Sequence, residues 1–126
     1  MASEFQWDSL DFLELLGSAP KVDDEYGICS EYVVQRGDLR LMISIWPLDC
    51  EVQISVYMAC QEEPLIHLRL LGTPGARVVN DKRGKFIEFA AANLFSGRFD
   101  FTVPAPYGFR VWADPYIKVE PYAYET

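Results

Sequence analysis

The stretch that decides the fold is residues 39–58, LRLMISIWPLDCEVQISVYM. Within each half of it, apolar residues occupy every second position, which is the period of a β-strand with one buried face. A four-residue segment, Pro47-Leu48-Asp49-Cys50, separates the two halves. The pattern therefore predicts a β-hairpin with strands at 39–46 and 51–58.

The register of this hairpin can also be predicted. A four-residue loop sets Trp46 opposite Glu51. The next pairs on one face join apolar residues of both strands: Ile45 with Val52, Ile43 with Ile54, and Leu41 with Val56. A slip of one residue would turn one apolar set toward solvent, so this register is favoured. It places Arg40 opposite Tyr57 on the other face, where a cation–π contact is expected.

Short alternating segments continue on both sides of the hairpin. We expect further strands at 26–35, 66–71, 77–79, 85–89, 98–103, 109–112 and 116–120. Gly37-Asp38 suits a two-residue hairpin turn with glycine first. Residues 90–95 are ambiguous between strand and one helical turn. About eight or nine short strands with tight turns favour a mainly β fold, an antiparallel sandwich or barrel, and no βαβ spacing is visible.

One helix is predicted at the front of the chain, at about residues 8–16. Asp8 is suited to the N-cap and Gly17 to the residue that ends the helix. Leu10, Leu13 and Leu16 are expected to form its buried stripe, which Phe12 and Leu15 widen. A helix of two to three turns is unstable alone and must pack on the strands.

The length of 126 residues fits one domain, with the helix followed by a strand-rich remainder at 26–121. No apolar run is long enough to span a membrane. The first residues lack the basic start and apolar stretch of a signal peptide, which favours a cytosolic protein. A bacterial source is expected only as part of the functional hypothesis given below.

The net charge of −8 is concentrated at the front of the chain. Residues 1–31 contain eight acids and one base, a charge of −7, so residues 32–126 carry only −1. An acidic chain argues against nucleic-acid binding and suits a basic protein partner. The candidate binding residues are the acids of the helix and of the loop after it: Asp8, Asp11, Glu14, Asp23, Asp24 and Glu25.

The residues that usually carry chemistry are sparse and scattered. Cys29, Cys50 and Cys60 form no CxxC pair and are expected to be reduced, partly buried thiols. His67 is the single histidine, and alternation places it on the polar side of its strand. No nucleotide-binding or nucleophile motif occurs, so we expect no enzyme activity, metal or cofactor.

One basic cluster stands out, at the turn between two predicted strands. It consists of Arg77, Lys82, Arg83 and Lys85. A charged hairpin tip explains it most simply. The functional alternative is a contact with an acidic partner, including the acidic front of a second copy.

Aromatic residues are dense in the last third of the chain, and alternation places most of them in the core: Phe95, Phe99, Phe101, Tyr107, Phe109, Trp112 and Tyr116. Tyr122 and Tyr124 lie past the last predicted strand and are expected to be exposed or frayed.

Three functions remain open. The favoured one is a non-enzymatic, protein-binding domain whose acidic front meets a basic surface. In profile such a domain resembles the immunity proteins that neutralise bacterial toxins, although no motif carries the resemblance. The alternatives are a small-ligand carrier or enzyme with an aromatic-lined barrel pocket, and a structural, oligomeric subunit joined through a sheet edge or through the face bearing Met42, Trp46 and Tyr57.

Overall fold

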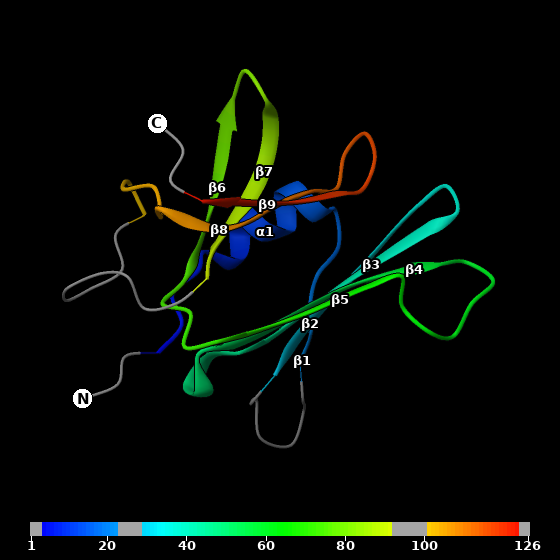
Figure 1. Ribbon diagram of the computed structural model, residues 1–126, viewed down its shortest axis with the longest axis horizontal. Helices are drawn as coiled ribbons and strands as arrows, with labels where there is room; N and C mark the ends of the chain where they lie inside the picture. Colours follow the sequence, from blue (N-terminus) through cyan, green and yellow to red (C-terminus); the bar gives the residue numbers. More distant parts are fainter. Residues whose placement is uncertain (1–3, 23–28, 92–100, 124–126) are drawn as a thin grey trace.

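The computed structural model describes residues 4–22, 29–91 and 101–123. These residues form two antiparallel sheets and one α-helix (Figure 1). The first sheet contains, in spatial order, β1 (Lys21–Val22), β2 (Ser30–Arg36), β3 (Leu39–Trp46), β4 (Glu51–Met58) and β5 (Ile66–Leu71). The second contains β6 (Ala76–Asp81), β7 (Gly84–Ala90), β8 (Tyr107–Trp112) and β9 (Lys118–Ala123). The described strands do not pair between the sheets, so the fold is a sandwich rather than a barrel, and the mainly β prediction is confirmed.

The hairpin of β3 and β4 has the predicted register. Trp46 lies opposite Glu51, and the apolar pairs beyond it follow as expected. The loop is a short 3₁₀ turn, Pro47–Asp49, which ends at Cys50 in the left-handed conformation. The guanidinium of Arg40 lies 4.7 Å from the ring centroid of Tyr57, so the predicted cation–π contact is confirmed.

The helix α1 (Ser9–Leu16) begins and ends at the predicted residues. One carboxylate oxygen of Asp8 accepts hydrogen bonds from the backbone N–H groups of Leu10 and Asp11, at 2.9 and 3.2 Å. Gly17 takes a φ of +74° and donates its N–H to Leu13, which closes the last turn. Local capping chemistry therefore fixes both ends of the helix.

The buried face of α1 differs from the predicted stripe. Phe12, Leu15 and Leu16 are buried, whereas Leu10 is 67% exposed and Leu13 is 39% exposed. Phe12 packs its ring 5.5 Å from that of Tyr32 on β2 and 6.1 Å from that of Phe89 on β7. The helix thus closes one side of the sandwich by contacting both sheets, and the predicted Leu10–Leu13–Leu16 stripe is wrong for its first two members.

Contacts before the helix determine this orientation. The backbone N–H of Phe5 donates to Pro47, and that of Gln6 donates to Pro74. Ala76 donates its N–H back to Gln6, so this segment lies against the junction of the two sheets. Phe5 itself is 2% exposed and joins the core. The chain therefore enters the helix from a fixed position, which turns the face with Phe12 inward.

The second sheet departs from the prediction in several places. Residues 101–103 form a turn rather than the end of a strand, and β9 runs to Ala123, beyond the predicted Glu120. Gly108 allows β8 to lie close to β7, because an added Cβ would collide with the Phe89 carbonyl oxygen. The hairpin of β6 and β7 is longer than predicted, and its two-residue turn is Lys82-Arg83.

The aromatic prediction for the last third is only partly confirmed. Trp112 is buried and Phe109 packs against the core, but Phe101 and Tyr116 are exposed. Tyr122 is half-buried within β9 and donates its hydroxyl to the Ala105 carbonyl, so its predicted exposure is wrong. The predictions for Phe95, Phe99, Tyr124 and the starts of strands 26–35 and 98–103 lie outside the described residues, as does most of the ambiguous segment 90–95.

Candidate functional site

The candidate site is the outer side of α1, which we name the acidic helix face. It consists of Leu10, Asp11, Leu13 and Glu14, all of them exposed. Because Phe12, Leu15 and Leu16 face the core, these four residues are the ones that α1 leaves at the surface in its middle turns. The face therefore combines two carboxylates with two apolar side chains, a composition suited to a protein contact.

The three candidate acids on the helix have different roles. Asp8 is used by its own helix as the N-cap. Asp11 and Glu14 make no ion pair with any residue that the structure describes. The charge of these two carboxylates is therefore not neutralised by the described arginines and lysines. Asp23, Asp24 and Glu25 lie outside the described residues.

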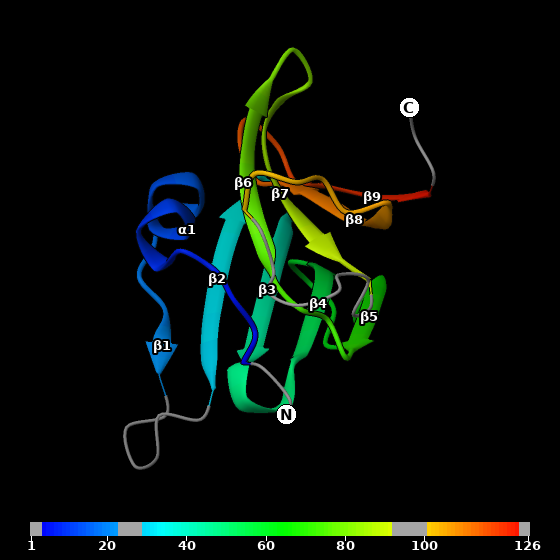
Figure 2. The ribbon, with the colours of Figure 1, turned by 90° about the vertical axis from the view of Figure 1, so that its left-hand side faces the viewer.

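An open pocket of about 180 Å³ lies at the edge of the first sheet, where the chain leaves the helix for β1. It is lined by Lys21, Val22, Cys29 and Glu31. Ser18 ties this region to the sheet by donating its hydroxyl to the Val33 carbonyl at 3.1 Å. Figure 2 shows α1 and β1 together on this edge, with β5 on the opposite one.

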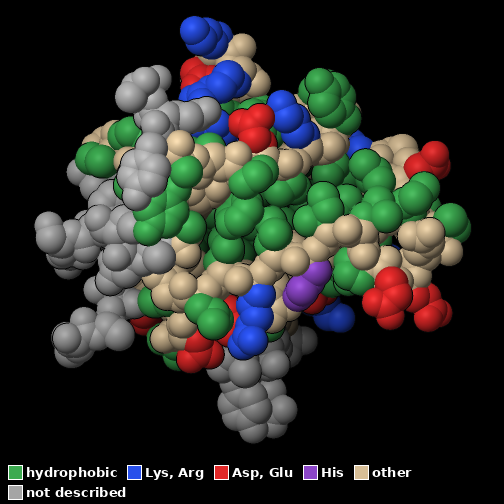
Figure 3. Space-filling view, viewed as in Figure 1, with side chains coloured by type: hydrophobic (Ala, Val, Ile, Leu, Met, Phe, Trp, Pro, Cys, Tyr) green, Lys and Arg blue, Asp and Glu red, His purple; other side chains and the backbone are tan. Residues whose placement is uncertain are grey.

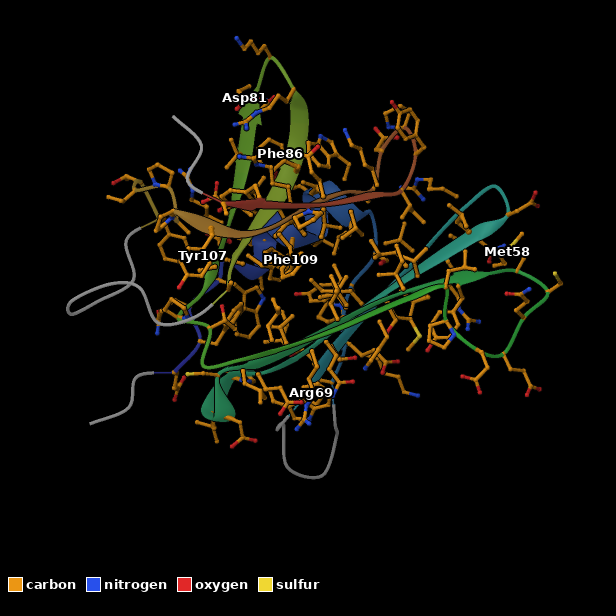
Figure 4. All side chains as sticks on the ribbon, viewed as in Figure 1. Met58, Arg69, Asp81, Phe86, Tyr107 and Phe109 are labelled. Atoms are coloured by element: carbon orange, nitrogen blue, oxygen red, sulfur yellow. The ribbon has the colours of Figure 1, made fainter. Side chains whose placement is uncertain are left out.

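The four residues of the basic cluster divide into two kinds. Arg77 donates to Glu88 at 2.9 Å, and Arg83 donates to Asp81 at 2.7 Å. The same Arg83 contact holds the pKa of Asp81 below its ordinary value. Lys82 and Lys85 are exposed at the far end of the hairpin that carries Asp81 (Figure 4). The two arginines are thus occupied by acids of their own hairpin.

A buried ionic network underlies the outer side of the second sheet. Glu88 is 4% exposed and accepts hydrogen bonds from Arg77 and from the backbone N–H of Ala105. Arg110, also 4% exposed, donates to Glu120 at 2.9 Å and lies 4.0 Å from the ring centroid of Tyr122. These contacts attach the 101–106 segment and β9 to the sheet, so we assign them a structural role.

The remaining chemical candidates do not form a catalytic cluster. His67 is exposed on β5, as predicted, and its Nδ1 lies 2.8 Å from the hydroxyl of Ser55. None of the three cysteines forms a disulfide; Cys29 and Cys50 are partly buried as expected, whereas Cys60 is exposed. Burial, followed by the nearby Asp49 and Glu4, raises the pKa of the Cys50 thiol. Within 4–22, 29–91 and 101–123, no three His, Cys, Asp or Glu residues gather as a metal site would require.

Side chains fill the space between the two sheets. Tyr32, Phe12, Phe89 and Ile54 are among the fully buried residues of this core. No helix among the described residues is long and apolar enough to cross a membrane.

Sequence reasoning missed the exposed Leu10–Leu13 pair, because five apolar residues within α1 leave the buried stripe undecided. It also missed the apolar edge of β5, where Leu65, Ile66 and Leu71 are exposed. Strand order was needed to reveal that edge, since alternation alone does not say which strand ends a sheet.

Comparison with known proteins adds one similarity of fold. No protein-family model matches the sequence, and no curated protein matches it. A solved structure described as a contact-dependent growth inhibition toxin–immunity protein complex from Klebsiella pneumoniae 342 contains a similar chain. The two superpose with a TM-score of 0.73 over 97% of this chain and 98% of the other, at 17% sequence identity. Similarity at that identity shows a shared fold.

Proposed function

We propose that this chain is a non-enzymatic immunity protein of the bacterial cytosol, which binds a toxin and blocks it through the acidic helix face. The observation that carries the proposal is the surface of α1, where Asp11 and Glu14 have no described ion pair and stand beside exposed Leu10 and Leu13. The fold shared with a chain of a toxin–immunity complex supports it.

The chemistry of this face favours a basic partner. Carboxylates that are not paired within their own chain are available to attract cations of another protein and to accelerate association. The adjacent leucines supply apolar area that the partner can bury. Toxins that act on nucleic acids need basic surfaces to bind phosphates, and an acidic protein face is complementary to such a surface.

The first experiment neutralises the face without disturbing the helix. A triple variant, Asp8→Asn, Asp11→Asn and Glu14→Gln, retains a residue that can cap the helix at position 8. A second variant neutralises Asp23, Asp24 and Glu25 in the same way. We expect each variant to bind its toxin, sought first among the products of neighbouring genes, with a Kd raised on the order of tenfold at low salt.

The matched control removes three acids elsewhere on the surface: Asp38→Asn, Glu62→Gln and Glu63→Gln, all exposed in turns. It changes net charge by the same amount as the triple variant of the helix. Equal loss of affinity in the control would show that net charge matters and the helix face does not. Unchanged affinity in both acidic variants would overturn the proposal.

Expression in cells shows whether this chain acts as an immunity protein or as a toxin. An immunity protein is harmless when expressed alone and restores growth to cells that express the toxin. If this chain alone arrested growth, it would have the opposite role. If this chain neither harmed cells nor protected them when it was co-expressed with the products of neighbouring genes, the structural-subunit alternative would be favoured.

A further inference from the structure

The outer edge of the first sheet carries an unusual concentration of exposed apolar residues. Among the described strands, β5 pairs with β4 on one side and with nothing on the other. Leu65, Ile66 and Leu71 are 53%, 41% and 57% exposed. These are three of the eleven large hydrophobic side chains exposed in the described part of the chain, and they fall within seven residues. Edge strands of monomers are usually protected by charges, prolines or bulges, because open backbone groups invite pairing.

The sequence of this edge has a symmetry about its central residue. Residues 65–71 read LIHLRLL. Leu68 is at the centre, with His67 on one side and Arg69 on the other, and two apolar residues follow on each side. Such a strand matches itself when a second copy runs antiparallel and Leu68 lies opposite Leu68. A two-fold dimer interface requires this kind of self-complementary surface.

We infer that the chain forms a two-fold dimer in which β5 pairs with β5 of a second copy. The five-stranded sheets of the two copies then form one continuous sheet. In this register, the inward-facing Ile66 meets Leu70 of the second copy. The exposed Leu65 meets the exposed Leu71 of the second copy, and this contact occurs twice. His67 lies opposite Arg69 of the second copy, and Arg69 is already held by Glu51 within its own chain.

The surface beside the β5 edge also suits contact with a second copy of the chain. Figure 3 shows a band of hydrophobic side chains across this face of the molecule, with charged side chains above and below it. Figure 4 shows Phe109 of β8, which packs against the core, between the two sheets, and Arg69 of β5 directed away from the sandwich. A second copy would cover part of the band with an identical apolar surface.

The charge distribution permits the pairing although each chain carries −8. The acidic helix face and β1 lie at the edge of the sheet opposite to β5 (Figure 2). Four strand spacings of about 4.8 Å separate β1 from β5, or roughly 19 Å. This exceeds the screening length of about 8 Å at physiological salt, so the acidic faces contribute little repulsion at the β5 edge.

A charge-pair experiment tests both the dimer and its register. Sedimentation velocity over a range of concentrations should show a monomer–dimer equilibrium for the unaltered chain. Leu65→Lys and Leu71→Glu each place a charge opposite an apolar residue at two symmetric positions. Each single variant should weaken dimerisation on the order of tenfold. The double variant sets the introduced ammonium of one copy opposite the introduced carboxylate of the other, twice, and should recover much of the lost affinity.

The controls separate dimerisation from folding and from the proposed function. Both leucines are more than half exposed, so thermal unfolding of dilute single variants should match that of the unaltered chain. Leu10→Lys, at a 67% exposed position on α1, should leave the dimer intact. A monomer at all concentrations would overturn the inference. So would a dimer insensitive to Leu65→Lys and Leu71→Glu, or a double variant as weak as the single ones. None of these results bears on toxin binding by the helix face.

Discussion

At the scale of single residues, the acids of α1 divide into one that the helix uses for its own folding and two that are left for the proposed recognition. Asp8 is exposed, yet its carboxylate accepts two backbone N–H groups and so belongs to the helix. Asp11 and Glu14 make no described ion pair. A count of acids in the sequence treats all three alike, because the count does not show which carboxylate the backbone already uses.

Capping by Asp8 leads to a stability prediction. Asp8→Ala leaves two N–H groups of α1 without a side-chain acceptor and should lower the free energy of unfolding by about 0.5–2 kcal/mol. Asp8→Asn keeps an acceptor oxygen and should remain close to the unaltered chain. Urea unfolding followed by circular dichroism measures both. Equal losses in the two variants would assign the effect to charge instead of capping.

The ion pair between Glu51 and Arg69 gives a prediction about pH. Arg69 and Gln53 both donate hydrogen bonds to the Glu51 carboxylate, at 3.0 and 2.9 Å, and hold its pKa below the ordinary value. As the pH falls below about 4.3, the unfolded chain takes up a proton at this carboxylate before the folded chain does. The stabilisation is therefore complete at neutral pH and is lost as the pH falls through the folded-state pKa.

The measurement compares the unaltered chain with Glu51→Gln by urea unfolding between pH 7 and pH 3. The difference in unfolding free energy should be largest at neutral pH and should shrink in acid. Arg69→Gln should show the same trend, because it removes the other partner. A difference that stays constant with pH would exclude this ion pair as the source.

At the scale of elements, the sequence predicted some parts to the residue and others incorrectly. The β3–β4 hairpin was predicted with its register because alternation and loop length independently required the same pairs. The ends of α1 were predicted because capping is local. The buried face of α1 was not, since it depends on where Phe5 and Gln6 attach to the sheets.

The prediction of a strand at 98–103 is wrong for its described residues, 101–103, for a similar reason. Phe101 and Val103 alternate as in a strand, yet residues 101–103 form a turn. The Phe101 carbonyl accepts from Arg77, a residue 24 positions earlier in the chain. Such a contact between distant positions leaves no periodic signal. The sequence suggested the candidate site only through an excess of acids, and the exposed leucines beside those acids could not be identified without the orientation of the helix.

The two faces of α1 should respond differently to truncation. Phe12→Ala empties a fully buried site between Tyr32 and Phe89 and should cost about 3–5 kcal/mol. Leu10→Ala removes a side chain that is 67% exposed and should change stability by less than about 0.5 kcal/mol. Chemical denaturation of both variants tests the observed orientation, and a costly Leu10→Ala would contradict it.

At the scale of the whole molecule, charge and apolar area lie at opposite edges of one sheet. The acidic helix face adjoins β1, and the apolar edge is β5 (Figure 2). Each surface is therefore able to engage its partner without obstructing the other. In the proposed dimer the two helix faces lie at the far ends of the joined sheet.

This separation predicts how salt affects the two associations. The rate of toxin association should fall steeply as ionic strength rises, because attraction between exposed charges is screened. Dimerisation through β5 should depend weakly on salt, since it buries apolar side chains. Stopped-flow kinetics and sedimentation in the same buffers make the comparison. A toxin association rate indifferent to salt would remove the electrostatic role of the helix face.

The two-sided use of α1 has an evolutionary consequence. Phe12, Leu15 and Leu16 are buried against the two sheets, while Leu10, Asp11, Leu13 and Glu14 are exposed. Substitutions at these exposed positions should therefore leave the packing of the buried face unchanged. A few substitutions within this eight-residue helix would then be enough to change which partner the acidic helix face binds.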